Sequence, residues 1–560
     1  MPRRPHISDL TCAIGLVLAL VLVLFGPPGT DLYAHRWYLS MLLGHHGIWN
    51  PWWYSGQVAF VGYSIVPYLL ASITSIKLVL VVSLWVSVLV ARSLRSLTSS
   101  RPLRVGLGVA MMTWPMVALS GDLAYIVGVA FAVLAGRALL GGHRSRFVLG
   151  AVLALGSSAL AVFFLGMVIG VLAISRVLAL EWRTLGTRRA LGRALRLVVT
   201  VDLLVPVGLV LFDVLVARGM DLGGRYPFFG SDLALMAVVA LSLVGVLTLL
   251  GGRRGDAERY LVIGALVYIA IGLVTFPIPD TLGSNVARVS ELGLAIAAVG
   301  AAMAWESRHQ VVGVSRRLGL GVLVAVLLGS ATYWNLASVD GPLVDRGPAA
   351  LSTAAGWEPL ETYLVHHLRP GQRVEAVDTT SHAAAYFLPS AGIPLMRGWY
   401  RQLDFPLNAA LYGVTLTPAR YVALLRRSAV AYVAVPPAPY DFSAAEEPAL
   451  VAHSSAFRFV GRFGEIGLYA LRAPEPLMPG AHILSYGYSG VRAEVTRPGR
   501  YAVSLRYSPY LVPSMGCIRQ RSDGRISWQI PHSGPVSLRF RFSWSVFLSQ
   551  EFAGNTSRCA

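Results

Sequence analysis

The chain of 560 residues is 55% hydrophobic and only 13% charged, and its mean hydropathy is +0.60. Soluble globular proteins of this length do not have such a composition, so it excludes that class and predicts a polytopic protein in a lipid bilayer. The formal net charge of +19 would suggest a nucleic-acid partner in a soluble protein. Here the arginines cluster in short loops between apolar runs, which is typical of membrane orientation, and we predict no nucleic-acid partner.

The first apolar run, residues 9–26, follows the basic segment MPRRPHISDL. No small-x-small cleavage site follows Phe25, and further apolar runs come later in the chain. We therefore interpret this run as an uncleaved first span rather than as a signal peptide.

Eleven apolar runs approach the length of roughly 20 residues that one membrane span requires. We place these spans at residues 9–26, 74–91, 104–119, 123–141, 146–159, 160–175, 198–217, 233–251, 260–276, 289–305 and 318–335. The fifth and sixth are short and turn at Gly156, Ser157 and Ser158. The interpretation of this pair sets the orientation of every loop that follows it.

The arginines are distributed unequally between alternate loops. The loops on the predicted outer side carry few, namely Arg36, Arg218, Arg225 and Arg288. Because basic residues in short loops stay on the cytoplasmic side, the pattern predicts a multi-pass protein of the cell membrane. Its N-terminus is expected in the cytoplasm and its C-terminal region outside.

From about residue 336 the hydrophobic runs shorten to the length of strands. Residues 373–378, 431–436 and 457–471 predict strands, and residues 357–368 and 418–427 predict helices. We therefore expect a small α/β or α+β unit in this part of the chain.

From about residue 480 alternating segments with turn signals predict a small β-sandwich. The expected domains are a transmembrane domain at 1–335, an extracytoplasmic α/β domain at 336–475 and an extracytoplasmic β-sandwich-like domain at 476–560. About 220 residues are enough for the exported part to bury a core of its own.

The three cysteines are Cys12 in the first apolar run and Cys517 and Cys559 in the C-terminal region. If that region lies outside the cytoplasm, Cys517 and Cys559 can form a disulfide. The sequence leaves a disulfide and two free thiols equally open.

The loop after the first span, GTDLYAHRWYLSMLLGHHGIWNPWWYSG, is rich in aromatic residues and contains one acid, Asp31. Asp31 and His35 are four residues apart and share a face if this segment is helical. The aromatic residues fit an interfacial belt as well as a binding surface, because Trp and Tyr collect at membrane interfaces. Asp31 favours a functional interpretation, because it follows a span where the headgroup of a lipid-linked substrate would lie.

The later outer loops also mix glycine, proline, aromatic residues, an acid and an arginine. Arg288 and Glu291 are three apart and can pair across one helical turn. Alternatively, Arg288 and Arg225 bind an anionic phosphate, which suits the forked donors of arginine. Asp122 is a further acid on the same predicted side.

Two acids, Asp202 and Asp213, lie within one predicted span and share a face, because eleven residues are close to three helical turns. Pairing with Arg196 or Arg218 is preferred here to a proton or ion relay. The sequence has no P-loop, GxSxG, CxxC or HExxH motif, and its histidines do not have convincing metal-ligand spacing. No cofactor is assigned, and a divalent metal stays open.

The stretch TDLYAHRWYLSMLLGHHGIWNPWWYSGQVAFVGYSIVPYLLA resembles the first loop of proteins related to the GT-C glycosyltransferase superfamily. It also resembles actinobacterial integral membrane proteins grouped as pyruvoyl-tetrahydropterin synthase-related. Further matching segments, in family order, are GGRYPFFGSDL, GSNVARVSEL, RGWYRQLDFPLNAALY and YVAVPPAPYDFS. Pterin chemistry is not expected, because pterin synthases are small soluble zinc enzymes with a histidine triad that this chain lacks.

The resemblance implies a GT-C-like transmembrane domain that transfers sugar from a polyprenyl-phosphate donor to an envelope glycan or lipid. It assigns the catalytic base to Asp31, with His35 as a supplement, because many GT-C enzymes have an acidic pair where this chain has one acid. The remaining expected substrate-binding residues are Arg288, Asn285, Asp122, Trp52, Trp53, Tyr63 and Arg225. The alternatives are a transporter or flippase that uses Asp202 and Asp213, and a non-catalytic envelope scaffold.

Overall fold

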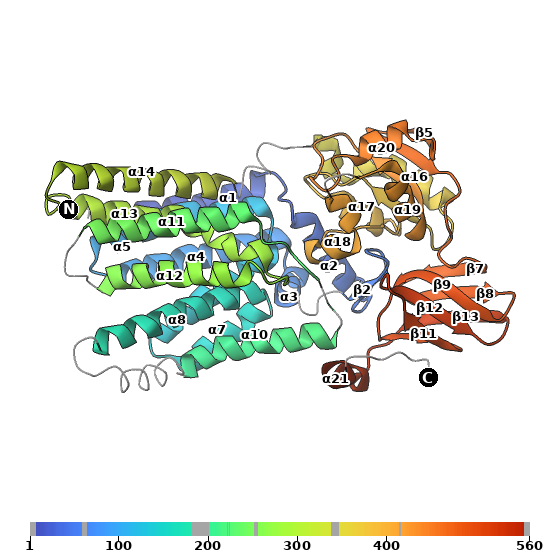
Figure 1. Cartoon of the computed structure of the whole chain (residues 1–560), viewed down its shortest axis with the longest axis horizontal. Helices are drawn as coiled ribbons and strands as arrows, with labels where there is room; N and C mark the ends of the chain where they lie inside the picture. The colour runs from blue at the N-terminus through green and yellow to red at the C-terminus, as the bar shows by residue number, and fades with distance from the viewer. Residues whose placement is uncertain are drawn as a thin grey trace. The chain divides into compact units, whose positions relative to one another are not determined.

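A computed structural model describes residues 7–58, 64–181, 201–220, 222, 224–250, 256–337, 347–413 and 416–553. The chain forms two compact units (Figure 1). We call them the helical unit, made of Met1–Gly29, Tyr63–Asp213 and Tyr226–Leu343, and the sheet unit, made of Thr30–Gly62, Val214–Arg225 and Val344–Ala560.

The helical unit consists of helices with apolar residues on most faces. In chain order these are α1 (Ile7–Phe25), α3 (Val66–Ile73), α4 (Ile76–Leu97), α5 (Arg101–Thr113), η1 (Trp114–Ser120), α6 (Leu123–Leu140), α7 (Arg144–Leu155), α8 (Ala159–Glu181), α10 (Val201–Gly219), α11 (Gly230–Leu249), α12 (Asp256–Thr275), η2 (Gly283–Leu292), α13 (Gly293–Ser307) and α14 (Val314–Ala337). The last part of α10 belongs to the sheet unit.

Eight helical segments in the described part of the chain are long and apolar enough to cross a membrane. They correspond to α4, α5 with η1, α6, α8, α11, α12, η2 with α13, and α14. Large apolar side chains such as Leu211, Leu273 and Trp305 remain more than half exposed, as a lipid-facing surface requires. These helices and the C-terminal sheets confirm the predicted fold class, a polytopic α-helical membrane protein with a C-terminal β-containing region.

The predicted count of eleven spans is not confirmed. The apolar part of α1, Asp9–Phe25, is shorter than the eight candidate spans. The predicted span at 146–159 forms α7, whose 12 residues extend over only about 18 Å, against about 30 Å for the hydrocarbon core of a bilayer.

The helical unit is held by close packing of small and apolar residues. One core cluster joins α11, α12, α13 and α14 around fully buried Met236, Val246 and Leu327. Glycines permit close approach between helices. A side chain on Gly106 of α5, for instance, would meet Val299 Cγ2 of α13 at 2.2 Å.

The sheet unit contains a four-stranded mixed sheet in the order β3-β4-β6-β5. Its strands are β3 (Arg373–Ala376), β4 (Val430–Val435), β5 (Phe457–Phe463) and β6 (Ile466–Leu471). β3 and β4 are parallel and the other pairs are antiparallel. The surrounding helices are η3 (Ala349–Ser352), α16 (Ala354–His367), α17 (Ala384–Ser390), α18 (Arg401–Leu407), η4 (Ala409–Tyr412), α19 (Pro418–Arg427) and α20 (Glu447–His453).

A sandwich of two antiparallel sheets follows, with strand orders β10-β13-β8-β7 and β11-β12-β9. The strands are β7 (Ala481–Gly487), β8 (Gly490–Val495), β9 (Gly499–Arg506), β10 (Leu511–Pro513), β11 (Cys517–Gln520), β12 (Arg525–Ile530) and β13 (Gly534–Phe540), and helix α21 (Trp544–Ala553) comes after them. Alternate residues face the core, which contains fully buried Ile518, Ile526 and Leu538.

The loop after the first span folds as part of the sheet unit. It forms helix α2 (Leu32–Leu43) and a two-stranded hairpin of β1 (Trp49–Asn50) and β2 (Gln57–Val58). Helix α2 packs against α17. The domain boundaries expected at residues 335 and 475 stay a prediction.

Candidate functional site

Asp31 lies at the N-terminus of α2 and is partly buried. Its Oδ1 oxygen accepts a hydrogen bond of 2.6 Å from the indole Nε1 of Trp399. The two residues are 368 positions apart in the sequence, and both belong to the sheet unit. The carboxylate that the first loop presents is therefore held by the C-terminal part of the chain.

His35 is one helical turn from Asp31, as its spacing in the sequence predicts. Its backbone N–H donates to the Asp31 carbonyl at 3.2 Å, and its side chain is fully buried. This burial makes His35 a core residue of the sheet unit, and the expectation that it supplements Asp31 in catalysis stays a prediction.

Trp52 and Trp53 are buried within the sheet unit, with 9% and 0% exposure. The Trp53 indole donates to the Ala385 carbonyl at 3.0 Å. Trp52 packs edge-on against Tyr486 and Tyr488, with ring centroids 5.9 and 5.5 Å away. Because these rings are covered by protein, we assign them to the core of the sheet unit rather than to a sugar-stacking surface.

The first loop makes three further contacts with the segment 395–400. The Leu395 amide donates to the Trp52 carbonyl at 2.8 Å. The Tyr400 amide donates to the Tyr54 hydroxyl at 2.9 Å. A side chain on Gly398 would meet the ring of Trp53 at 2.2 Å. Since only glycine permits this approach, Gly398 fixes the backbone next to Trp399 against the first loop.

Trp399 is itself packed among charged side chains. Its ring stacks on the imidazole of His382 at a centroid distance of 3.3 Å and an interplanar angle of 10°. His382 Nδ1 lies 2.9 Å from both carboxylate oxygens of Asp378. The guanidinium carbon of Arg401 lies 4.5 Å from the centre of the Trp399 ring.

Arg401 also forms an ion pair with Asp441. Burial alone would raise the pKa of Asp441, but the Arg401 guanidinium holds it below its usual range. Ser443 donates to the same carboxylate through its amide at 2.9 Å and its hydroxyl at 2.6 Å. The carboxylate is thus kept ionised, which fixes Arg401 beside Trp399.

The helical unit contains a second polar cluster, around Arg288 of η2. Arg288 Nη1 forms an ion pair with Asp122 Oδ2 at 2.6 Å, and Arg288 Nε donates to Asn285 Oδ1 at 3.1 Å. Asp122 also caps α6 by accepting from the Tyr125 amide at 3.0 Å. The structure therefore brings together three of the residues that the sequence assigned to substrate binding.

Arg288 is paired with Asp122, and the pairing with Glu291 suggested by their spacing stays a prediction. The guanidinium carbon of Arg288 lies 4.9 Å from the centre of the Tyr125 ring. Of the Arg288 side chain, 26% remains exposed. This arginine is therefore oriented by its neighbours but still accessible.

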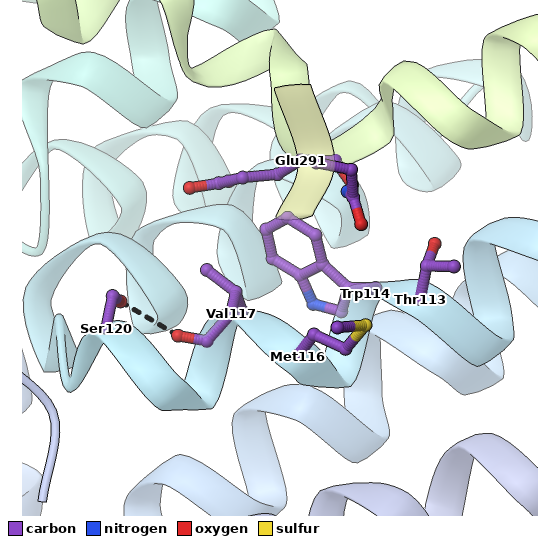
Figure 2. Close-up of a pocket in the computed structure, with 7 residues that line it drawn as sticks. Thr113, Trp114, Met116, Val117, Ser120 and Glu291 are labelled. Atoms are coloured by element: carbon purple, nitrogen blue, oxygen red, sulfur yellow. Dashed lines mark hydrogen bonds between the residues drawn. The ribbon is translucent and has the colours of Figure 1, made fainter. Parts of the chain in front are cut away.

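A cavity of about 20 Å³ lies between η1 and η2 in the helical unit. Figure 2 shows Glu291 beside the indole of Trp114, with Thr113 from α5 and Met116, Val117 and Ser120 from η1 around them. Within the described residues, Glu291 Oε2 has no hydrogen-bond partner. A cavity of this volume holds about one water molecule and cannot hold a sugar.

The remaining expected site residues are Arg225, Tyr63, Cys517 and Cys559. Arg225 is exposed in the sheet unit, and its amide donates to the Gln402 carbonyl at 2.7 Å. Tyr63 lies outside the described residues. Cys517 is disulfide-bonded, and Cys559 lies outside the described residues, so its identity as the partner stays a prediction.

Asp202, in the first turn of α10, forms an ion pair with Arg144 at 3.6 Å. The pairing of this acid with an arginine agrees with the interpretation preferred from the sequence, although Arg196, the partner expected there, lies outside the described residues. In the part of the chain that the structure describes, no group of three or more His, Cys, Asp and Glu side chains could hold a metal ion.

The sequence reasoning missed the residues around Trp399, namely Asp378, His382, Arg401 and Asp441. A signal for this region is present in the sequence. Trp399, Arg401 and Asp441 lie in two of the segments that match the family, RGWYRQLDFPLNAALY and YVAVPPAPYDFS. No sequence pattern connects those segments to Asp31.

No protein-family model matches the chain, and no curated protein is similar to it in sequence. Among solved structures, the chain is similar to the arabinofuranosyltransferase AftD from mycobacteria, with 14% identity and a TM-score of 0.45 over 90% of this chain and 41% of AftD. The chain thus spans about two fifths of the length of AftD.

The chain is also similar to the oligosaccharyltransferase of Archaeoglobus fulgidus in its apo form, with 12% identity and a TM-score of 0.41 over 84% of this chain and 75% of that one. For the archaeal oligosaccharyltransferase AglB from Archaeoglobus fulgidus, in complex with an inhibitory peptide and a dolichol phosphate, the identity is 12% and the TM-score is 0.40 over 83% of this chain and 74% of that one. TM-scores below 0.5 do not establish a shared activity.

Proposed function

We propose that the chain is a membrane glycosyltransferase that moves a sugar from a polyprenyl-phosphate donor to an envelope glycan or lipid. The transfer takes place at the outward face of the cell membrane. The N-terminus is cytoplasmic and the sheet unit extracytoplasmic in this proposal, as the distribution of arginines predicts.

The observation that carries the proposal is the fixed but accessible Arg288 in a unit of membrane-crossing helices. A polyprenyl chain dissolves among lipids, whereas its phosphate needs a cation near the end of a span. Arg288 precedes α13 in a segment that counts among the candidate spans, and Asp122 and Asn285 orient its guanidinium. The planar donors of arginine match the oxygens of a phosphate.

The proposed reaction needs a base and a leaving group. An acceptor hydroxyl oxygen attacks the anomeric carbon of the donor sugar, and its proton passes to the Asp31 carboxylate. The bond between the anomeric carbon and the phosphate oxygen breaks, and its electron pair leaves with the lipid phosphate. The products are the inverted glycoside and the lipid phosphate, and Asp31 then releases its proton to water.

The transporter alternative is weakened by one observation, because Asp202, one of its two acids, lies in an ion pair with Arg144. The scaffold alternative predicts no transfer at all. Glycosyl transfer is therefore the proposal to test first.

The test uses the full chain in lipid nanodiscs with radiolabelled polyprenyl-phosphate sugars and envelope-glycan acceptors. Asp31→Asn should lower the transfer rate by about 10²–10⁴-fold, the usual contribution of a general base. Arg288→Gln should raise the KM for the donor by about 10-fold, since losing a charged hydrogen bond costs 1.5–3 kcal/mol.

Arg308→Gln is the matched control for Arg288→Gln. Arg308 also lies over an aromatic ring in the helical unit, 3.9 Å from the centre of Trp305, but no carboxylate holds it in the structure described. Its replacement should change transfer by less than twofold. Equal effects of the two arginine variants would contradict a specific role of Arg288 in binding the donor phosphate. Unchanged transfer by Asp31→Asn would show that Asp31 is not the base.

A further inference from the structure

We propose that Trp399 is a positioning residue, which holds the Asp31 carboxylate in the orientation needed for proton transfer. This inference rests on the proposed function. Trp399 belongs to the sheet unit and follows β3 in the chain. The inference therefore gives the sheet unit a direct part in the reaction.

The contact that carries the inference is the hydrogen bond of 2.6 Å from Trp399 Nε1 to Asp31 Oδ1. An indole N–H only donates and does not change its protonation within the physiological pH range. Its bond to a carboxylate oxygen therefore persists whatever the protonation of nearby groups. A base must point at the proton it removes, and a misplacement of about 1 Å can cost about 10²-fold in rate.

Helix α2 does not orient the Asp31 carboxylate through a capping bond. Asp31 occupies the N-cap position of α2, where an acid usually accepts a hydrogen bond from the first turn. Its side chain makes no such capping bond. The carboxylate is turned instead toward the segment 395–400.

Trp399 can act as a fixed support because its ring is held by neighbours. The imidazole of His382 stacks on the ring at 3.3 Å, and Asp378 holds that imidazole through His382 Nδ1 at 2.9 Å. The side chain of His382 is only 3% exposed. Arg401 lies against the Trp399 ring as well. A ring held by both a stacked imidazole and a guanidinium keeps its N–H pointing in one direction.

The backbone on either side of Trp399 is fixed in the same way. Gly398 packs on Trp53 of the first loop, and Tyr400 donates through its amide to Tyr54 at 2.9 Å. Asp31, Trp53 and Tyr54 belong to the first loop, so the segment 398–400 and that loop are joined at three consecutive positions. Of these positions, Trp399 donates to the acid Asp31.

The test compares Trp399→Phe with the wild-type chain in nanodiscs. Phenylalanine keeps an aromatic ring against His382 but lacks the N–H donor. We expect kcat for sugar transfer to fall by about 10–100-fold, with KM for donor and acceptor within twofold. Trp399→His retains a ring N–H. On a logarithmic scale, its kcat should lie at least one third of the way back from the Trp399→Phe value to the wild-type value.

Trp528→Phe is the matched control. Trp528 is a buried tryptophan of the sandwich with 1% exposure, and its Nε1 donates to the Met515 carbonyl at 2.9 Å. Its replacement removes an N–H bond of the same kind from a residue that does not contact Asp31. We expect the kcat of this variant to equal that of the wild type when both are expressed per folded protein, with the folded fraction measured by thermal unfolding.

Two failures have different meanings. If Asp31→Asn abolishes transfer but Trp399→Phe keeps wild-type kcat, the positioning role is wrong and the proposed function stands. If Asp31→Asn transfers sugar at the wild-type rate, the base assignment fails before Trp399 is considered. Equal losses of kcat in Trp399→Phe and Trp528→Phe would show a general effect of lost packing and overturn the inference.

Discussion

Arg397 and Glu447 form an ion pair of 2.6 Å in the interior of the sheet unit, where the Arg397 side chain is 5% exposed and that of Glu447 fully buried. Arg397 Nε also donates to Glu375 Oε1 at 2.7 Å, and the Tyr421 hydroxyl donates to Glu447 Oε2 at 2.6 Å. The Arg397 guanidinium thus contacts two buried carboxyl groups, two residues before Trp399 in the chain.

Removing the cation of this cluster should destabilise the sheet unit. Arg397→Met leaves two buried carboxyl groups without their partner, and breaking such a pair from one side costs about 3–5 kcal/mol. Thermal unfolding in detergent should show a drop in Tm of at least several degrees. Arg458→Met, at an exposed position of β5, should leave Tm within about 1 °C, and a similar small change for Arg397→Met would contradict this account.

The two carboxyl groups should respond differently to neutral substitution. Burial raises the pKa of both Glu375 and Glu447, and the Arg397 guanidinium lowers both. Both oxygens of Glu447 have side-chain partners, Arg397 and Tyr421, whereas Glu375 Oε2 has no hydrogen-bond partner among the described residues. Glu375→Gln should therefore cost less than about 1 kcal/mol, whereas Glu447→Gln changes a carboxyl group that is bonded through both oxygens and should cost about 3 kcal/mol. Chemical unfolding of both variants at pH 7 checks the order, and the reverse order would refute this account of the cluster.

Glu361 of α16 should make the stability of the sheet unit depend on pH. Burial, with a smaller effect of the Glu358 charge, raises the pKa of Glu361 to about 7. A raised carboxyl pKa contributes stability below the unfolded value of about 4.3, and this contribution is lost as pH rises through about 7. Glu361→Gln should thus raise Tm at pH 8 relative to wild type and match it at pH 4. Glu494→Gln, at an exposed position of β8, is the control and should show no such difference.

Gly398→Ala should disturb the contact between the first loop and the rest of the sheet unit. The added Cβ would meet the Trp53 ring at 2.2 Å, and overpacking of this kind typically costs about 1–3 kcal/mol. Gly413→Ala is the matched control, because a Cβ there meets its nearest neighbour at an ordinary 3.7 Å. Unfolding curves in detergent measure both, and equal stability of the two variants would argue against the close packing.

The thiols should be countable by titration with a chromogenic disulfide. The chain has three cysteines, Cys12 is free and Cys517 is disulfide-bonded. If Cys559 is its partner, denatured protein should show one thiol without reductant and three after reduction. Cys559→Ser should then release the thiol of Cys517, and a count of three in the unreduced wild type would disprove the pairing.

The sequence predicted the elements of this fold better than their grouping. Apolar runs of span length and alternating strands depend on local patterns, so α4, α6, β4 and β5 lie where they were expected. The short α7 shows the limit of that reasoning, because an apolar composition does not by itself provide enough residues to cross a bilayer.

The candidate site was harder to predict, because its contacts join distant segments. The pattern around Asp31 suggested a functional acid, and the segment RGWYRQLDFPLNAALY was noted as well. Nothing local to either one shows that Trp399 bonds to Asp31. Likewise, Asp122 and Arg288 are 166 residues apart, and their pairing follows from helix packing rather than from spacing. Aromatic residues of the first loop looked suited to an interface, but burial in the sheet unit explains Trp52 and Trp53.

The distance in sequence between Asp31 and Trp399 has a consequence for how the protein is made. The two residues are separated by 368 positions, and ribosomes add about 5–20 residues per second. The segment around Trp399 is therefore synthesised about 20–70 s after the first loop. During that time its tryptophans lack the core in which they are finally buried. Biogenesis of this chain thus requires the earliest loop to remain available until the last third of the protein has been translated.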